Sequence, residues 1–99
     1  MTYLTETNFR PETEGSVLPV LVGFYPAGSL QEQSLRELER EHPDRIKFCA
    51  VDAAKEKKLA HAFRILSVPT LVLLEKGEIL QRIRGERDKE ALTKILDLD

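Results

Sequence analysis

The chain has 99 residues, of which 41% are hydrophobic and 32% charged, and its formal net charge is −2. This composition is typical of an ordinary globular protein, and residues 1–99 are expected to form a single domain around one modest core. The small negative charge disfavours nucleic acid or an anionic membrane as the main partner, because both select clustered basic residues. The longest apolar run, residues 68–74, is much too short to span a bilayer.

A buried strand followed by a polar helix is the first clear pattern in the chain. Residues 19–25 form a continuous apolar, β-branched and aromatic run, which is typical of a strand covered by helices on both faces of its sheet. Gly28 lies in the break after this strand, and Ser29 begins a helix that runs to about Glu41. Pro43 stops this helix, because the residue before a proline avoids the helical conformation.

The remaining chain alternates between strands and helices. A strand over residues 46–51 precedes a short helix over residues 55–63, whose inward residues are expected to be Leu59, Ala62 and Phe63. The last third contains a strand at residues 70–74, a hairpin turn at 75–78, a strand at 79–83, and a helix capped by Asp88 with a stripe of Leu92, Ile95 and Leu96. With a short opening strand and helix, this order predicts an α/β fold with a mixed sheet of four to five strands and helices on both faces.

Cys49 is the only cysteine, so the chain cannot form an internal disulfide. Small domains in oxidising compartments usually contain several cysteines, and the first residues lack the features of a secretory signal, so a cytoplasmic location is expected. Cys49 lies within an interior strand and is expected to be a buried structural thiol, with a reactive or intermolecular thiol as the alternative. One cysteine and two separated histidines, His42 and His61, predict neither a metal site nor a cofactor.

The order of elements and several local strings resemble the thioredoxin family over nearly the whole chain. Leu4 and Thr5 with Phe9 resemble the opening strand and first helix of that family, and residues 19–25 resemble the central strand that leads into its active-site loop. Residues 67–70, Ser-Val-Pro-Thr, resemble its cis-proline motif. The resemblance implies a thioredoxin fold with a peptide-binding groove formed by Gly28, Ser29, Leu30, Val68, Pro69, Arg84 and Gly85.

This sequence departs from the thioredoxin pattern where the family carries its dithiol. The two cysteines of the family motif fall on Ser29 and Glu32, and neither side chain contains sulfur. The family's buried aspartate and lysine fall on Gly23 and Ala50, and Tyr25 lies where a tryptophan flanks the motif. Because thiol–disulfide exchange needs a reactive thiolate and a second thiol, the departures favour a domain that has lost this chemistry.

Ser29 and Glu32 also have the spacing of a helix capping box. In that motif the serine oxygen accepts from the backbone N–H of the glutamate, and the glutamate carboxylate accepts from the N–H of the serine. We therefore expect both side chains to close the start of the helix. Ser29 is not expected to be a nucleophile, because no base is placed within its reach.

The favoured interpretation is a redox-inactive interaction or assembly module that binds a protein or an extended peptide, and not an enzyme. In it, Arg84 would favour an acidic residue in the bound segment. The alternative is an atypical thiol–disulfide oxidoreductase that works through Cys49 or through a thiol of its partner. A homodimer formed through an exposed sheet edge is a further possibility.

Overall fold

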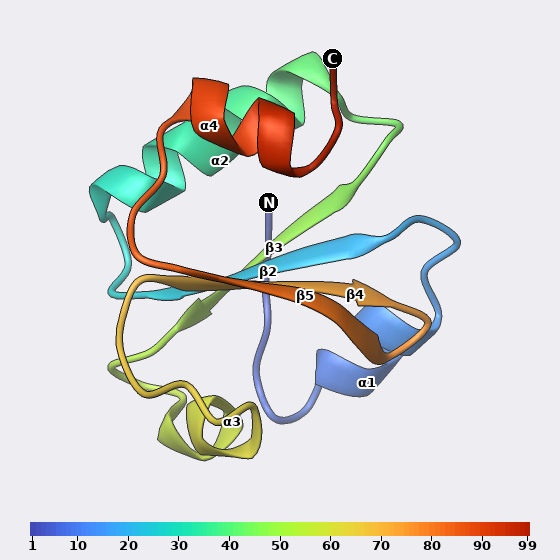
Figure 1. The fold of residues 1–99 in the computed structure, drawn as a ribbon. Coiled ribbons are helices and arrows are strands. Elements are labelled where there is room, and N and C mark those ends of the chain that lie inside the picture. The colour runs from blue at the N-terminus through green and yellow to red at the C-terminus, as the bar shows by residue number, and fades with distance from the viewer.

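The structure is a computed structural model that describes residues 1–99. Its centre is a five-stranded sheet with the strand order β1-β3-β2-β4-β5, in which β1, β3 and β2 are parallel and β4 and β5 are antiparallel to their neighbours (Figure 1). The predicted mixed sheet with helices on both faces is confirmed. The strands are β1 (Thr2–Tyr3), β2 (Val20–Tyr25), β3 (Lys47–Asp52), β4 (Thr70–Glu75) and β5 (Glu78–Arg84), and the helices are α1 (Phe9–Glu14), α2 (Leu30–Glu41), α3 (Lys57–Ala62) and α4 (Lys89–Ile95).

The sheet separates two hydrophobic cores. Helices α2 and α4 cover one face, and α1 and α3 cover the other (Figure 1). Every residue of β2 is buried, and alternate side chains enter opposite cores. Leu21 and Tyr25 face α2 and α4, whereas Val22 and Phe24 face α1 and α3. The continuous apolar run that the sequence shows is therefore required by burial on both faces.

The bounds of the opening strand and the inward face of α3 differ from the predictions. The opening strand is Thr2–Tyr3 rather than Leu4 and Thr5, although Leu4 is buried and its N–H donates to the carbonyl oxygen of Ala50 at 2.8 Å. In α3 the predicted inward residue Ala62 is exposed, and Leu59 is buried as predicted. Ala60 and Phe63 pack against the core beside Leu59. The buried face of the helix is therefore formed by Leu59, Ala60 and Phe63, and Ala62 lies on the opposite side.

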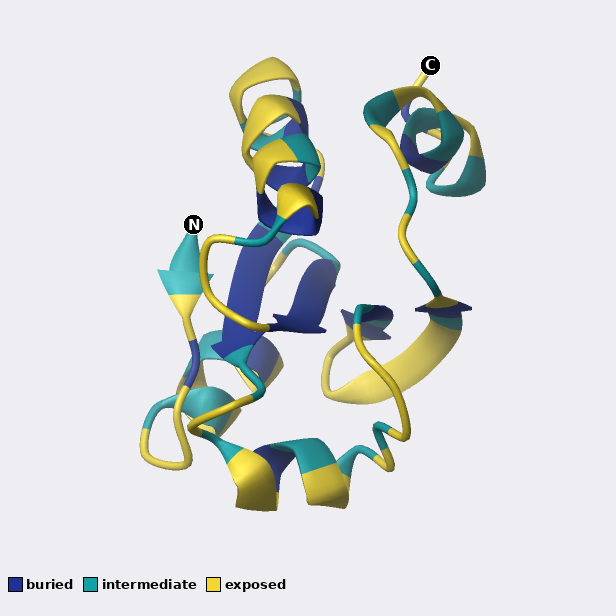
Figure 2. Cartoon of the chain, turned by 90° about the vertical axis from the view of Figure 1, so that its left-hand side faces the viewer, coloured by how far each residue is buried: buried dark blue, intermediate teal, exposed yellow.

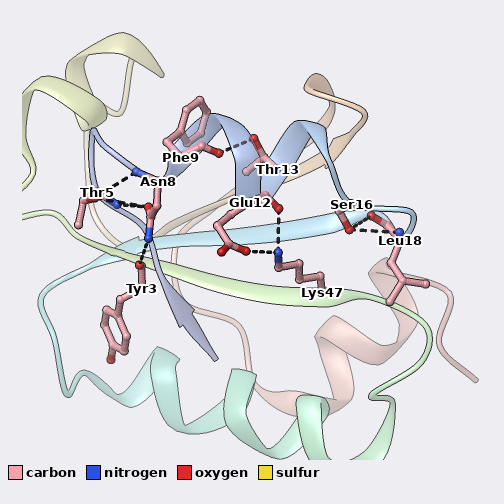
Figure 3. Close-up of polar contacts among 9 residues, drawn as sticks. All are labelled: Tyr3, Thr5, Asn8, Phe9, Glu12, Thr13, Ser16, Leu18 and Lys47. Atoms are coloured by element: carbon pink, nitrogen blue, oxygen red, sulfur yellow. Dashed lines mark hydrogen bonds and ion pairs between the residues drawn. The ribbon is translucent and has the colours of Figure 1, made fainter.

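Polar contacts attach α1 to the strands beside it (Figure 3). The N–H of Thr5 donates to Oδ1 of Asn8 at 2.7 Å, and Nδ2 of Asn8 donates to the carbonyl oxygen of Tyr3 at 3.1 Å. Farther along the helix, Nζ of Lys47 donates to the carbonyl oxygen of Glu12 at 2.9 Å and pairs with its carboxylate. The two ends of the short helix are thus tied to β1 and to β3.

The last helix begins where the sequence predicts. Oδ1 of Asp88 accepts from the backbone N–H of Ala91 at 2.9 Å, so Asp88 is a side-chain N-cap. Leu92 is fully buried against the α2 side of the sheet, with Ile95 and Leu96 packed at its edge. None of the four helices is long and apolar enough to cross a membrane.

Candidate functional site

The ends of three strands meet at one edge of the sheet. The register pairs Phe24 with Thr70 and Thr70 with Arg84, which brings together the carboxyl end of β2, the amino end of β4 and the carboxyl end of β5. Helix α2 starts from the same edge, a few residues after β2. Figure 2 looks onto this edge and shows the outer side of α2 exposed and its inner side buried against the sheet. The predicted groove residues all belong to these segments.

Pro69 lies at the centre of this edge. The Val68–Pro69 peptide bond is cis, and the carbonyl oxygen of Pro69 accepts from the N–H of Gly85 at 3.0 Å. Val68 is 47% exposed, and neither its backbone N–H nor its carbonyl has a hydrogen bond within the chain. Arg84 is exposed beside Gly85. Four of the predicted groove residues, Val68, Pro69, Arg84 and Gly85, are therefore neighbours at this edge.

Gln31 connects the start of α2 to the segment after β5. It is fully buried, its Nε2 donates to the carbonyl oxygen of Arg87 at 2.9 Å, and its Oε1 accepts from the N–H of Arg87 at 2.8 Å. These two bonds fix Leu30, which is 64% exposed, to the same edge as Arg84. This pair was not predicted from the sequence, because a glutamine in the first turn of a helix has no distinguishing pattern and its partner is 56 residues away.

The capping box is wrong, although the position of the helix start is right. Ser29 is the N-cap residue of α2, but its side chain makes no capping bond and its buried Oγ has no hydrogen-bond partner. The N–H of Glu32 donates to the carbonyl oxygen of Ser29 at 3.1 Å, and the N–H of Ser29 donates to the carbonyl oxygen of Pro26 at 3.2 Å. The Glu32 carboxylate instead accepts from the Tyr3 hydroxyl and pairs with Nε of Arg36 at 3.3 Å.

A tyrosine fills the space beneath the start of α2. Tyr25 is fully buried, and its hydroxyl has no hydrogen-bond partner. Burial, together with the charge of Glu32, raises the pKa of Tyr25 well above its usual range. A Cβ atom added at Gly23 would overlap the Tyr25 ring and lie 3.0 Å from Cδ1 of Leu35. The position where the resemblance places a buried aspartate thus has no room for a side chain.

Cys49 differs from the residues of this edge in both its location and its reactivity. It is fully buried in β3, and its side chain enters the core under α1 and α3, on the face of the sheet opposite α2. The predicted burial is confirmed. Burial in this apolar core raises the pKa of the Cys49 thiol to about 11. The thiol is therefore neither ionised at neutral pH nor open to a molecule bound beside Pro69.

Other parts of the molecule add little to a candidate site. The largest concavity, of about 400 Å³, lies at the opposite end of the sheet and is lined by residues of the segments 16–18 and 43–48 together with Thr2 and Glu39. No three His, Cys, Asp or Glu side chains gather closely enough to hold a metal ion. The edge around Pro69 is therefore the surface on which the predicted functional residues converge.

Comparison with known proteins gives one consistent family. A sequence model of the thioredoxin family matches residues 1–98. Thioredoxin of Bacillus subtilis (strain 168) is 29% identical over 97 residues, which cover 94% of this chain and 91% of that protein. Thioredoxin of Alicyclobacillus acidocaldarius is 29% identical over 93 residues, covering 90% of this chain and 88% of that protein. The bifunctional thioredoxin reductase/thioredoxin of Mycobacterium leprae is 27% identical over 97 residues, covering 94% of this chain and 21% of that protein.

These matches contradict the prediction of a redox-inactive, protein-binding module. The relatives are named as thioredoxins, and none of the matches points to a redox-inactive role. The alternative interpretation, a thiol–disulfide oxidoreductase, agrees with them better. The prediction of lost chemistry rested on the departures at Ser29 and Glu32, and the match to thioredoxins outweighs it. The match spans nearly the whole chain and the predicted fold is confirmed, so the chain belongs to the thioredoxin family.

Proposed function

We propose that this chain promotes thiol–disulfide exchange between molecules that bind at the edge around Pro69, with the attacking thiol supplied by a partner. The match to thioredoxins along residues 1–98 is the observation that carries the reaction class. We place the reaction in the cytoplasm, where thiols are kept reduced and can act as electron donors. The chain itself supplies binding and orientation.

The position of Cys49 favours a partner's thiol over a thiol of this chain. The thiolate is the nucleophile in disulfide exchange, and its yield at neutral pH falls as the thiol pKa rises. Burial raises the pKa of Cys49 to about 11, and no surface of the side chain is exposed. A sulfur bound beside Pro69 would also be separated from Cys49 by the sheet.

Exposed backbone groups at the edge suit a bound sulfur and its flanking chain. The backbone N–H of Leu30 has no hydrogen bond within the chain, and it lies at the start of a helix of 12 residues, where the helix dipole favours a thiolate. The free N–H and carbonyl of Val68 can pair with an extended segment as an added strand does.

The reaction balances without a sulfur of this chain. A thiol of the partner loses its proton to water, and the resulting thiolate attacks one sulfur of the bound disulfide. A new sulfur–sulfur bond forms to the attacked sulfur, and the other sulfur leaves as a thiolate at the start of α2 before taking a proton from water. A second thiol of the partner then attacks the mixed disulfide, so the partner dithiol is oxidised and the substrate disulfide is reduced.

An exchange assay with a dithiol and a peptide disulfide tests this proposal. Dithiothreitol serves as the electron donor, and the protein is expected to raise the rate of peptide reduction above the rate without protein. Cys49→Ala is expected to keep this activity, because the thiol takes no part. A wild-type rate equal to the blank would refute the proposal. Loss of activity in a folded Cys49→Ala protein would assign the thiol to Cys49 instead.

A negative charge placed at the start of α2 provides a second test of the proposed function. Leu30→Asp puts a carboxylate at the helix start, beside the free backbone N–H of residue 30, where it stabilises the helix but repels a thiolate. The exchange rate should therefore fall while the unfolding midpoint stays equal or rises. Val17→Asp is the matched control, because Val17 is 95% exposed in the loop at the opposite end of the sheet. Equal rates for Leu30→Asp and Val17→Asp would show that exchange does not occur at the start of α2.

A further inference from the structure

Two arginines, Arg84 and Arg87, flank Gly85 in the chain at the edge around Pro69. Arg84 is exposed at the end of β5, where it is paired in register with Thr70. Nη1 of Arg87 lies 3.1 Å from the position that a Cβ atom would take on Gly85, and it donates to the carbonyl oxygen of Glu86 at 3.2 Å. Because the N–H of Gly85 is bonded to the carbonyl of Pro69, both cations border the proposed binding surface.

Neither cation is neutralised by a carboxylate of the chain. The ion pairs of the molecule involve Met1, Arg10, Arg36, Lys47 and Lys89 as cations, and none involves Arg84 or Arg87. The nearest acidic residues along the chain are Glu86, which is exposed, and Asp88, whose Oδ1 caps α4. A chain with a formal net charge of −2 thus presents two unpaired positive charges beside Pro69.

Apolar side chains accompany these charges. Leu30 at the start of α2 is 64% exposed, and Val68 is 47% exposed on the loop before β4. An extended segment lying along Val68 would place its side chains alternately toward the sheet edge and toward solvent. A segment with an apolar residue against Leu30 and Val68 and an acidic residue toward the two arginines complements this surface in both respects.

We propose that the edge around Pro69 selects extended protein segments in which acidic residues flank the reactive cysteine. This inference rests on the proposed function and deepens it, because it names the class of substrate. The arginines act as specificity-determining residues: they contact the flanking carboxylates and take no part in the exchange of sulfur atoms. Their contribution is electrostatic and should therefore weaken as salt is added.

Matched peptides test the selectivity. Three short peptides of one sequence carry Glu, Gln or Lys on both sides of a central cysteine, and three further peptides carry serine in place of that cysteine, so that binding is measured without exchange. The Glu peptide is expected to bind about threefold to tenfold more tightly than the Gln peptide, as for exposed charge pairs at the rim of an interface. The Lys peptide should bind most weakly, and high salt should reduce the differences.

Charge reversal identifies the residues responsible. Arg84→Glu is expected to abolish the preference for the Glu peptide, and Arg84→Glu with Arg87→Glu to reverse it toward the Lys peptide. Arg10→Glu makes the same change of charge on α1, where the side chain is 85% exposed, and should leave the preference intact. An equal preference in wild type and in folded Arg84→Glu protein would overturn the inference. The inference would also be overturned if small anionic thiols bound to this surface and none of the peptides displaced them.

The two proposals can fail separately. A charge preference in the serine peptides without any catalysed exchange would uphold the acidic selectivity and refute the proposed function. Catalysed exchange at equal rates for the Glu, Gln and Lys disulfides would uphold the function and refute the selectivity. Circular dichroism of each variant shows whether a change in binding comes from loss of the fold.

Discussion

Replacing Gln31 by leucine should destabilise the fold, although leucine is similar in size and apolar. The side chain makes two hydrogen bonds with the backbone of Arg87, at 2.9 and 2.8 Å, and both are lost in Gln31→Leu. Each hydrogen bond contributes about 0.5–1.5 kcal/mol, so the free energy of unfolding should fall by roughly 1–3 kcal/mol. The expected loss of stability is smaller than the cost of leaving fully buried backbone groups without hydrogen bonds, because Arg87 is only half-buried and water can reach part of its backbone.

Urea unfolding followed by far-ultraviolet circular dichroism measures this loss, and it suits a chain without tryptophan. For a domain of this size, 1 kcal/mol corresponds to a shift of about 4–8 °C in Tm, so thermal unfolding gives an independent reading. Gln33→Leu is the matched control, because Gln33 is exposed on the same helix. If the two leucine variants differ by less than about 0.5 kcal/mol, the bonds to Arg87 do not hold α2 to the segment after β5.

Three further predictions concern the helix cap, the core and the buried thiol. Gly23→Ala should lower the free energy of unfolding by about 1–3 kcal/mol, because the added Cβ overlaps the Tyr25 ring. Adding Tyr25→Leu should recover part of this loss in the same urea assay. An unchanged stability of the single variant would show that the ring can move aside. Asp88→Ala should cost about 0.5–2 kcal/mol and Asp88→Asn much less, since asparagine can still accept from the N–H of Ala91; equal losses would show that the charge, and not the cap, matters. The native Cys49 thiol should react slowly with a thiol reagent at neutral pH. Burial raises the pKa of this thiol from 9.0 to about 11, so the folded state keeps the thiol proton at pH values where the unfolded state loses it. The stability of the wild type relative to Cys49→Ala should therefore decline as the pH rises through this interval. A constant difference would contradict the burial.

The sequence by itself determined the order of elements and the fold class. The continuous apolar run at residues 20–25 requires a strand covered on both faces, and the structure buries all six of its residues. Asp88 and the start of α2 at Ser29 were located correctly, because helix ends depend on residues close in the chain. Alternation and helical spacing likewise assigned Leu92 to the core. Each of these features depends on side chains within a few positions of one another.

The chemistry at the start of α2 was decided only by tertiary structure. Ser29 and Glu32 have the spacing of a capping box, yet Glu32 bonds to Tyr3, which is 29 residues away in the chain. The family resemblance placed Gly23 where an aspartate belongs, but only the packing shows that the Tyr25 ring occupies that space. A side chain such as that of Glu32 can bond to a neighbour in the chain or to a distant residue that the fold brings within reach. A local sequence pattern shows only the neighbours.

The separation of Cys49 from the edge around Pro69 has the same origin. Its strand and its burial were predictable from the sequence, whereas the face it occupies depends on the register of β3 against β2, which pairs Cys49 with Val22. A shift of one residue would turn the thiol toward α2, because successive side chains point to opposite faces of a sheet. Hydrophobic patterning therefore determined that the thiol is buried. The pairing of strands placed it on the opposite face of the sheet from the surface where exchange is proposed.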